Sequence, residues 1–374
     1  MFPYNNAKRF LSKTIRQPGY GLRVFVKRVE ALRLYHMGQG QTSLPESVTL
    51  FLTHRCNLHC KMCGQDHSPE EDFPMLAAEG LIDELAGFKP HITLFGGEPL
   101  LHPDCARLIR RIKQKNMHCL MITNGSLLEP LAKEIVESRL DELNISLDGD
   151  RELHDRIRGA AGLFEKVLKG VEEVQALKKQ KKRARPLIHL QCTMTSYNYM
   201  FLEKLLGVAR RAKADSLTFH NLIFMEEKTL QEQKACDERL GCDSRRWEGF
   251  VFEPKMDPGL LYKNMKRLLS EKPGCSVDFY PNFSYAGLKK YYQKGQSGDL
   301  SRKGLRCLSP WIAAYVFPDL EVRPCLNSSY SFGNLKEKKF VRIWNGDEAK
   351  KFRRLLKKEK SFPACLRCTE LYRY

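Results

Sequence analysis

Residues 48–63 read VTLFLTHRCNLHCKMC, an apolar run that leads directly into three cysteines. Rich in Val, Thr and Phe, the run 48–53 predicts a buried strand. Cys56, Cys60 and Cys63 follow it with the spacing C-x3-C-x2-C. Three thiolates on one loop can hold three irons of a [4Fe–4S] cubane and leave the fourth iron open to another ligand. A zinc loop is the alternative, although zinc prefers four closed ligands.

Strand-like and helical segments alternate downstream of this loop. Further strands are expected at 91–95, 118–122, 142–147, 187–194 and 215–223, with helical patterns near 75–87, 104–116, 127–138, 161–182 and 199–212. Six strands separated by helices predict an α/β fold with a parallel sheet and right-handed crossovers. In such folds the functional site collects at the carboxyl ends of the strands.

Two short motifs fall at these strand ends. Gly96-Gly97-Glu98-Pro99 follows the second strand, and Ser146-Leu147-Asp148-Gly149 closes the fourth. Together with the cysteine triplet, they make residues 47–224 resemble the radical S-adenosylmethionine (AdoMet) superfamily. The resemblance implies a partial (β/α)6 TIM-like barrel that binds a [4Fe–4S] cluster and AdoMet.

The resemblance also implies roles for individual residues. Cys56, Cys60 and Cys63 would ligate the cluster, whose open iron would bind the amino and carboxylate groups of AdoMet. Gly96 and Gly97 would bring the backbone close to the cofactor, since glycine permits such an approach. The next two residues of that motif are Glu98 and Pro99.

Glu98 would accept a charge-assisted hydrogen bond from the methionyl ammonium of AdoMet. Ser146 and Asp148 would face the ribose or the methionyl tail. Arg158 could clamp a carboxylate, or it could pair with an acid. Met62 stands where the family usually has an aromatic residue against adenine, and its thioether can pack there instead.

A second set of cysteines lies near the end of the chain. Cys307, Cys325, Cys365 and Cys368 form a complete ligand set, grouped as C…C…C-x2-C. A zinc ribbon and buried unligated cysteines are the alternatives. With its Ser-Pro-Trp, Gly-Asn-Leu and Ile-Trp-Asn segments, the stretch 305–368 resembles the SPASM/twitch extension of radical AdoMet enzymes.

That second resemblance implies a small cysteine-rich domain with an auxiliary [4Fe–4S] cluster. Only one auxiliary cluster is expected, because none of the six residues after Cys368 is a cysteine. Leu320 stands where the family usually has a glycine, so a local difference in the hairpin turn is expected. The predicted division of the chain is a basic N-terminal extension, the barrel, an insertion or linker and the SPASM/twitch domain, at 1–46, 47–225, 226–304 and 305–374.

The 374-residue chain carries a net charge of +19, concentrated in three blocks. Residues 1–45 hold eight basic residues and one acid, Glu30, while the other blocks are 178–185 and the last forty residues. Such a surplus favours an anionic partner, either nucleic acid, anionic lipid or a phosphorylated substrate. Solvated protein faces are the alternative.

The first block also carries apolar residues at helical spacing, namely Leu22, Phe25, Val26, Val29 and Leu32. A basic amphipathic helix can lie on a membrane surface, or its apolar stripe can dock on its own domain. No run of 18 apolar residues and no secretory signal is evident. A cytoplasmic protein is therefore expected, either free or peripheral to a membrane. In that compartment its 13 cysteines favour metal binding or redox chemistry over disulfides.

The resemblance implies that AdoMet is cleaved to a 5′-deoxyadenosyl radical, which abstracts a hydrogen atom from a substrate. An external one-electron donor of the flavodoxin or ferredoxin type is implied. We expect oxidation or rearrangement of a small sugar or alcohol, or of an anionic or lipid-linked substrate. Peptide side-chain modification is an alternative. A nucleic-acid-binding protein with structural clusters is another, but no nucleic-acid motif accompanies the charge. The sequence indicates no catalytic base.

Overall fold

The computed structural model describes residues 18–67, 71–271, 274–293 and 306–372, with side chains from residue 25 onward. These residues divide into two compact units, which we call the barrel unit and the composite unit. The barrel unit contains residues 50–222 and 253–293. The composite unit contains 1–49, 223–252 and 294–374, so it is assembled from three separate parts of the chain.

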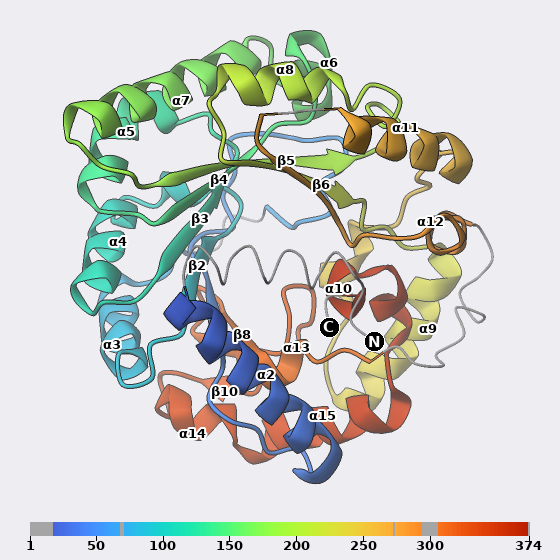
Figure 1. Cartoon of the computed structure of the whole chain (residues 1–374). Helices are drawn as coiled ribbons and strands as arrows, with labels where there is room; N and C mark the ends of the chain where they lie inside the picture. Colours follow the sequence, from blue (N-terminus) through green and yellow to red (C-terminus); the bar gives the residue numbers. More distant parts are fainter. Residues whose placement is uncertain (1–17, 68–70, 272–273, 294–305, 373–374) are drawn as a thin grey trace. The chain divides into compact units, whose positions relative to one another are not determined.

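A parallel sheet forms the centre of the barrel unit (Figure 1). Its strands follow one another in chain order. They are the last two residues of β1 (Ser47–Phe51), then β2 (His91–Phe95), β3 (Cys119–Thr123), β4 (Glu142–Ser146), β5 (Leu187–Met194), β6 (Ser216–Asn221) and β7 (Ser276–Tyr280). Each pair from β2–β3 to β6–β7 is parallel. The predicted α/β fold with a partial barrel is therefore confirmed.

β7 is a strand that the sequence did not reveal. It pairs with β6, with Phe219 opposite Phe279, and their rings stack with centroids 5.2 Å apart. β7 lies in the segment 226–304, which was expected to be an insertion or linker. In the structure residues 253–293 of that segment form α11 (Pro258–Ser270), β7 and α12 (Tyr285–Tyr292) of the barrel unit.

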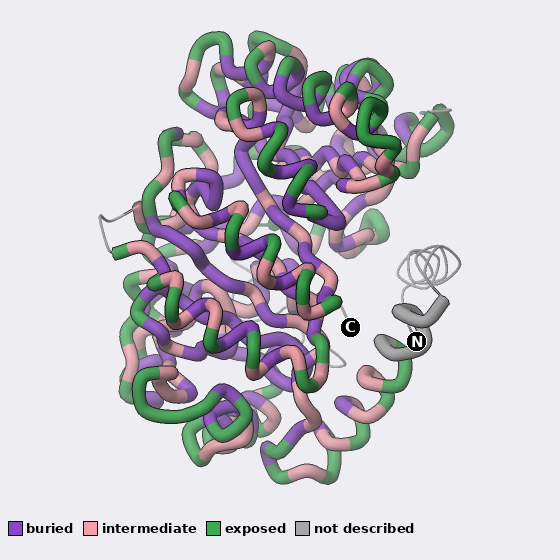
Figure 2. The backbone as a smooth tube through the Cα atoms, turned by 90° about the vertical axis from the view of Figure 1, so that its left-hand side faces the viewer, coloured by how far each residue is buried: buried purple, intermediate pink, exposed green. Residues whose placement is uncertain are grey.

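Amphipathic helices cover the outer side of this sheet (Figure 1). The helices between the strands are α3 (Met75–Leu85), α4 (Cys105–Gln114), α5 (Leu128–Glu137), α6 (Arg151–Arg158), α7 (Leu163–Gln180) and α8 (Lys204–Arg211). In α4 the buried residues are Cys105, Leu108, Ile109 and Ile112, which share one face of a helix. Figure 2 shows buried segments running through the interior, with exposed residues on the outer turns.

The composite unit combines short helices with a small antiparallel sheet. β8 (Ala313–Val316) pairs with β9 (Glu321–Arg323), and β9 pairs with β10 (Gly333–Asn334). Its helices are α2 (Pro18–Met37), α9 (Glu227–Leu240), α10 (Arg245–Glu248), α13 (Ser309–Ile312), α14 (Phe340–Trp344) and α15 (Asp347–Glu359), with the 3-10 turns η2 (Pro363–Arg367) and η3 (Thr369–Tyr372). No described helix is long and apolar enough to cross a membrane.

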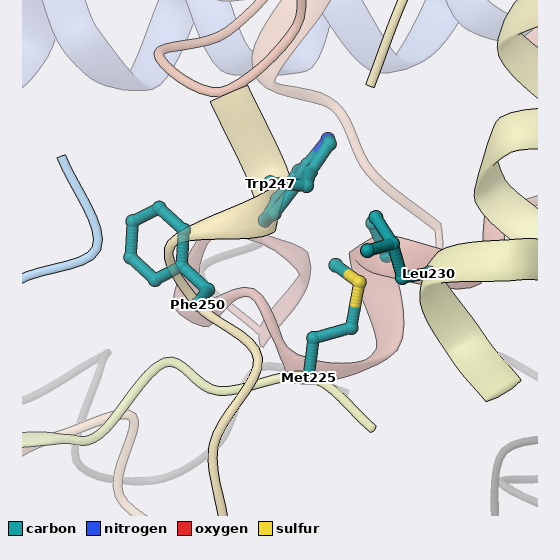
Figure 3. Close-up of a cluster of buried hydrophobic side chains, with 5 residues drawn as sticks. Met225, Leu230, Trp247 and Phe250 are labelled. Atoms are coloured by element: carbon teal, nitrogen blue, oxygen red, sulfur yellow. The ribbon is translucent and has the colours of Figure 1, made fainter. Parts of the chain in front are cut away.

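One apolar cluster joins α9 and α10 to the last turns of the chain. Met225, Leu230, Trp247 and Phe250 pack together with Ala364 of η2 (Figure 3). Cys368 packs against the edge of the same cluster. Residues 223–252 therefore support the C-terminal cysteine segment, a contact that no sequence motif indicates.

In two of the three basic blocks, some basic side chains form hydrogen bonds or ion pairs with residues of the same unit. In α15 the buried Arg353 donates to the carbonyls of Pro310, at 2.7 Å, and Trp344, at 2.8 Å. In the block 178–185, Lys181 pairs with Glu137 at 2.8 Å and Arg185 with Asp141 at 2.5 Å. Part of the excess of lysine and arginine thus stabilises the fold and is not available to an anionic partner.

Candidate metal centres

The first cysteine loop is held against the end of β2 by backbone hydrogen bonds. Gly97 N donates to Thr53 O at 2.8 Å, and Glu98 N donates to Arg55 O at 2.9 Å. A Cβ on Gly96 would lie 2.6 Å from Thr53 O, and one on Gly97 would lie 2.3 Å from Arg55 O. No side chain fits at that distance. The two glycines thus bring the backbones of β2 and the cysteine loop together, a role that sequence reasoning had not foreseen.

Each sulfur of this loop has a polar side chain beside it. Cys56 and Cys60 are half-buried, while Cys63 is exposed. The contacts are Asn124 Nδ2 to Cys56 Sγ at 3.9 Å, Arg158 Nη1 to Cys60 Sγ at 3.6 Å and His67 Nε2 to Cys63 Sγ at 3.4 Å. Polar groups around thiolate ligands hold them in place and tune the metal that they bind.

Electrostatics also fit a metal cluster on this loop. Desolvation by the surrounding chain raises the pKa of Cys56 to about 11. It also raises the pKa of Cys60 and of the partly exposed Cys63, while the charge of Arg158 opposes the rise at both. Without a cation, these thiols stay protonated at neutral pH. Bound iron would supply the positive charge that stabilises three neighbouring thiolates. The residues present therefore fit a three-thiolate cluster.

Glu98 is fully buried and bridges the ends of two strands. Its Oε1 accepts hydrogen bonds from Thr123 Oγ1 at 2.7 Å and Leu100 N at 3.0 Å, and its Oε2 accepts one from Asn124 N at 2.7 Å. Burial raises the pKa of Glu98, and these three donors act against the rise. The carboxylate thus fixes the loop after β3, including Asn124 beside Cys56. Its contact with the AdoMet ammonium stays a prediction.

Asp148 is a second buried carboxylate, at the end of β4. Its Oδ2 accepts from Arg158 Nε at 2.6 Å, and its Oδ1 accepts from Thr193 N at 2.9 Å. Of the two roles expected for Arg158, the structure shows the ion pair with an acid. Because Arg158 also donates to Cys60, the pair links the fourth and fifth strands to the cysteine loop.

The remaining expected residues lie on the same loops. Pro99 is buried and opens the 3-10 turn η1 (Pro99–Leu101), Ser146 is half-buried as the last residue of β4, and Met62 is half-buried between Cys60 and Cys63. Their contacts with AdoMet stay predictions. Sequence reasoning missed Asn124 and His67. Asn124 and Gly125 form an Asn-Gly pair, which by sequence indicates only a turn, and His67 follows Cys63 by four residues.

His154 makes a pH-sensitive contact with Asp148 in the loop after β4. Its Nδ1 accepts a hydrogen bond from Asp148 N at 3.2 Å, and burial lowers its pKa to about 4. Between pH 6.5 and 4, the unfolded chain binds a proton that the folded His154 does not. The free energy of unfolding should therefore decrease as the pH is lowered through this window, by up to about 1.4 kcal/mol per pH unit.

The measurement is urea unfolding of wild type and His154→Asn at several pH values. The asparagine carbonyl can still accept from Asp148 N but does not titrate. The difference in stability between the two proteins should change between pH 6.5 and 4 and stay constant above pH 7.5. A constant difference throughout would remove His154 as the source of acid sensitivity.

The four C-terminal cysteines lie in the composite unit. Cys307 is buried before α13, Cys325 follows β9, and Cys365 and Cys368 lie in and after η2. Burial, and the neighbouring cysteines or acids, raise the pKa of Cys325, Cys365 and Cys368 to about 12. Such crowded, buried thiols fit a cationic cluster, which would offset the charge of four thiolates.

Two local details bear on this second centre. Leu320 adopts a left-handed backbone conformation with φ +68°, so the turn before β9 keeps a geometry that glycine adopts with less strain. The described residues include no group of three His, Cys, Asp or Glu side chains close enough to bind a single metal ion. A four-iron cluster does not require the ligands to converge on one ion, since each thiolate binds a different iron.

α9 supports the C-terminal cysteine turns through a buried polar chain. Gln233 Oε1 accepts from Ala364 N at 2.9 Å, next to Cys365, and Gln233 Nε2 donates to Asp237 Oδ1 at 2.9 Å. After α9, Asp243 N donates to Ser329 Oγ at 3.2 Å, four residues beyond Cys325. One stretch of chain therefore holds both the Cys365 turn and the loop after Cys325.

Gln233→Ala should loosen the second centre. The substitution leaves Ala364 N buried without an acceptor, at a cost of about 1–3 kcal/mol, and removes one donor from Asp237, which keeps its hydrogen bond from Ser244 Oγ. We expect the purified protein to lose auxiliary iron faster to a chelator. Gln231→Ala is the matched control, because Gln231 is exposed on the same helix. Equal rates of iron loss in the two variants would contradict this role for Gln233.

Comparison with known proteins identifies the family. The profile of the radical SAM superfamily matches residues 50–188, and that of the SPASM iron–sulfur cluster-binding domain matches residues 307–369. The chain is a radical SAM enzyme with a C-terminal SPASM domain. The radical SAM domain implies a [4Fe–4S] cluster with AdoMet, and the SPASM domain implies auxiliary iron–sulfur binding.

Two relatives from Methanosarcina barkeri resemble this radical SAM enzyme over most of its length. A Fe-coproporphyrin III synthase is 28% identical over 78% of this chain and 72% of its own. An AdoMet-dependent heme synthase is 26% identical over 87% and 89%. Among solved structures, SuiB of Streptococcus suis matches with a TM-score of 0.63 and 14% identity, over 87% of this chain and 69% of SuiB. The likeness to SuiB concerns the fold alone.

Proposed function

We propose that this radical SAM enzyme cleaves AdoMet reductively at a cluster held by Cys56, Cys60 and Cys63, and abstracts a hydrogen atom from its substrate. The observation that carries the proposal is the loop itself, in which each of the three sulfurs has its own polar neighbour. The cluster and AdoMet together would supply a 5′-deoxyadenosyl radical, formed with one electron from an external flavodoxin or ferredoxin-type donor.

The protein's own residues would position these groups and limit their motion. Glu98 and Asp148 are buried and fully engaged, so they hold the loops after β2 and β4 in fixed positions. Arg158 places a fixed positive charge beside Cys60. Such preorganisation is what a reactive radical demands, because the abstracted hydrogen must lie close and other donors must be kept away.

We propose that Cys307, Cys325, Cys365 and Cys368 hold one auxiliary [4Fe–4S] cluster. Four cysteines occupy all four irons of such a cluster, which suits electron transfer and leaves no open iron for the substrate. After loss of a hydrogen atom, the substrate would give one electron to this centre and one proton to solvent or a base, for a net two-electron oxidation.

The substrate we propose is a small alcohol or sugar, or an anionic or lipid-linked molecule. The anionic class is supported by the net charge of +19. An iron porphyrin is a second candidate, favoured by similarity to the coproporphyrin and heme synthases, each of which this chain covers over more than two thirds of its length. Peptide modification is an alternative for which the likeness to SuiB gives no argument, because that likeness concerns the fold alone.

The test is anaerobic reconstitution followed by incubation with AdoMet and dithionite. We expect 5′-deoxyadenosine and about eight irons per chain, as two four-iron clusters require. Adding Fe-coproporphyrin III, or separately a lipid extract, should speed 5′-deoxyadenosine formation if that class contains the substrate. Bound zinc without AdoMet cleavage would refute the proposed chemistry.

A further inference from the structure

The strands of the barrel unit have an outer face, which packs on the helices, and an inner face. Cys105 of α4 contacts Met121 of β3, with Sγ 3.8 Å from Sδ. A Cβ on Gly125 would lie 3.0 Å from Val167 of α7 and 3.2 Å from Ile145 of β4. Met121 and Ile145 therefore point outward. Because side chains alternate along a strand, the residues next to them point to the inner face.

The inner face carries a row of polar side chains across four neighbouring strands. In the register of the sheet, Ser146 of β4 is the partner of Gln191 of β5, Gln191 of Thr218 of β6, and Thr218 of Asp278 of β7. Neighbouring strands lie about 4.8 Å apart. The row therefore presents hydroxyl, amide and carboxylate groups at regular intervals of about that length. Asn144 lies on the same face, two residues before Ser146.

Polar groups at the amino ends of these strands are engaged with one another. Glu142 Oε1 lies 3.2 Å from His118 Nε2, and Glu142 Oε2 lies 3.3 Å from His189 Nε2. His189 Nδ1 shares a hydrogen bond with Ser216 Oγ at 2.7 Å. The chain itself thus provides partners for the polar side chains at this end of the inner face.

The side chains of Asn144 and Gln191 lack such partners. Within the part of the chain that the structure describes, neither of the two makes a side-chain hydrogen bond. Asn144 is 8% exposed, and its Oδ1 is buried with no partner. Buried polar atoms in folded proteins almost always have a partner. The Asn144 oxygen therefore requires a donor that the described residues do not supply.

Gln191 also belongs to the strand that supports the cysteine loop. Its backbone oxygen accepts from Leu147 N at 2.8 Å. The next residue, Asp148, accepts from Arg158, which in turn donates to Cys60. A substrate bound at Gln191 would thus be held by an element that is tied to the proposed cluster loop. Hydrogen abstraction requires such close and fixed positioning.

We propose that Asn144 and Gln191 bind hydroxyl groups of a small, hydroxyl-rich substrate, a sugar or cyclitol, on the inner face of the sheet. The inference rests on the proposed radical chemistry and selects one of its substrate classes. A hydroxyl group both donates and accepts, so it can satisfy either end of a side-chain amide. The apolar face of an iron porphyrin would leave both amides unpaired, and a site built for hydrogen bonding rejects such a ligand.

The experiment is isothermal titration calorimetry of the full-length, reconstituted enzyme with myo-inositol, D-glucose or D-glucosamine. AdoMet is present and the reductant is left out, so binding is measured without radical formation. We expect at least one of these compounds to bind at millimolar concentration. Gln191→Leu should weaken that binding about tenfold, because a hydrogen bond is lost. Asn144→Ala should weaken it to a similar extent.

The matched control is Gln114→Leu, since Gln114 is exposed at the end of α4 in the same unit. This control should bind as wild type does, and iron content and circular dichroism should confirm that all variants fold. After dithionite is added, the bound compound should speed 5′-deoxyadenosine formation, and Gln191→Leu should raise its KM about tenfold.

Two results would overturn the sugar site. One is that none of the three compounds binds, and the other is that a folded Gln191→Leu binds them as wild type does. AdoMet cleavage without sugar binding would remove the site and leave the radical chemistry standing. Sugar binding that Gln191→Leu weakens, without AdoMet cleavage on reduction, would retain the site and refute the chemistry.

Discussion

Changing Cys56, Cys60 and Cys63 together to alanine should abolish formation of 5′-deoxyadenosine from AdoMet. The three sulfurs are the only cysteine ligands offered by the loop after β1, and each has a polar neighbour in place. Without them, an iron cluster has no thiolate anchor there, and AdoMet has no open iron to bind. The measurement is chromatography of the reaction with AdoMet and dithionite, together with iron and sulfide analysis.

The iron count separates loss of one cluster from loss of the fold. The triple variant should keep roughly half the wild-type iron, because the four C-terminal cysteines are untouched. Cys105→Ala is the control, since Cys105 is a buried thiol of α4 that contacts Met121 Sδ at 3.8 Å. This control should retain the full iron content and cleavage. Cleavage by the triple variant would show that the cluster is bound elsewhere.

The sequence predicts the site to the level of loops, because a parallel sheet brings the carboxyl ends of its strands to one edge. That rule was enough to group the cysteine triplet with the motifs at 96–99 and 146–149. It could not assign partners to the charged residues. Two roles were open for Arg158, and only the position of α6 relative to β4 shows that its Nε lies 2.6 Å from Asp148 Oδ2.

Gly96 and Gly97 have a role inside the chain besides the one expected from the sequence. The absence of their Cβ atoms makes room for the backbone of Thr53 and Arg55, while their approach to the cofactor stays a prediction. Sequence shows that a close approach is needed, but it does not show what approaches. Glu98 illustrates the same limit, because its partners Thr123 and Asn124 come from a neighbouring strand end.

The supporting elements of the second half were not predictable for another reason. β7 has the pattern SVDFY, and only Phe279 of its five residues is fully buried, so no clear strand periodicity exists. α9 reads EKTLQEQKACDERL and buries polar residues such as Gln233 and Asp237. A helix that packs through polar side chains does not produce an apolar stripe, which is the signal that sequence reasoning relies on.

Replacing Cys365 and Cys368 together with serine should separate AdoMet cleavage from substrate oxidation. The auxiliary cluster would lose two of its four ligands, and about four of eight irons should be lost with it. The proposed ligands of the radical-forming cluster, Cys56, Cys60 and Cys63, belong to the barrel unit and are unchanged in this variant, so 5′-deoxyadenosine should still form. Without an electron acceptor, the substrate radical would take a hydrogen atom back from 5′-deoxyadenosine or another donor, or decay, and oxidised product should fall at least about tenfold.

Product measured against 5′-deoxyadenosine is the quantity that tests this arrangement. In wild type the ratio should approach one, and in Cys365→Ser/Cys368→Ser it should fall while iron drops by half. Cys275→Ser is the control. Cys275 is a free cysteine of the barrel unit that belongs to neither set of proposed cluster ligands, so this variant should leave the ratio unchanged. A double variant with half the iron and an unchanged ratio would show that the electron leaves the substrate by another route, and the auxiliary centre would then be structural.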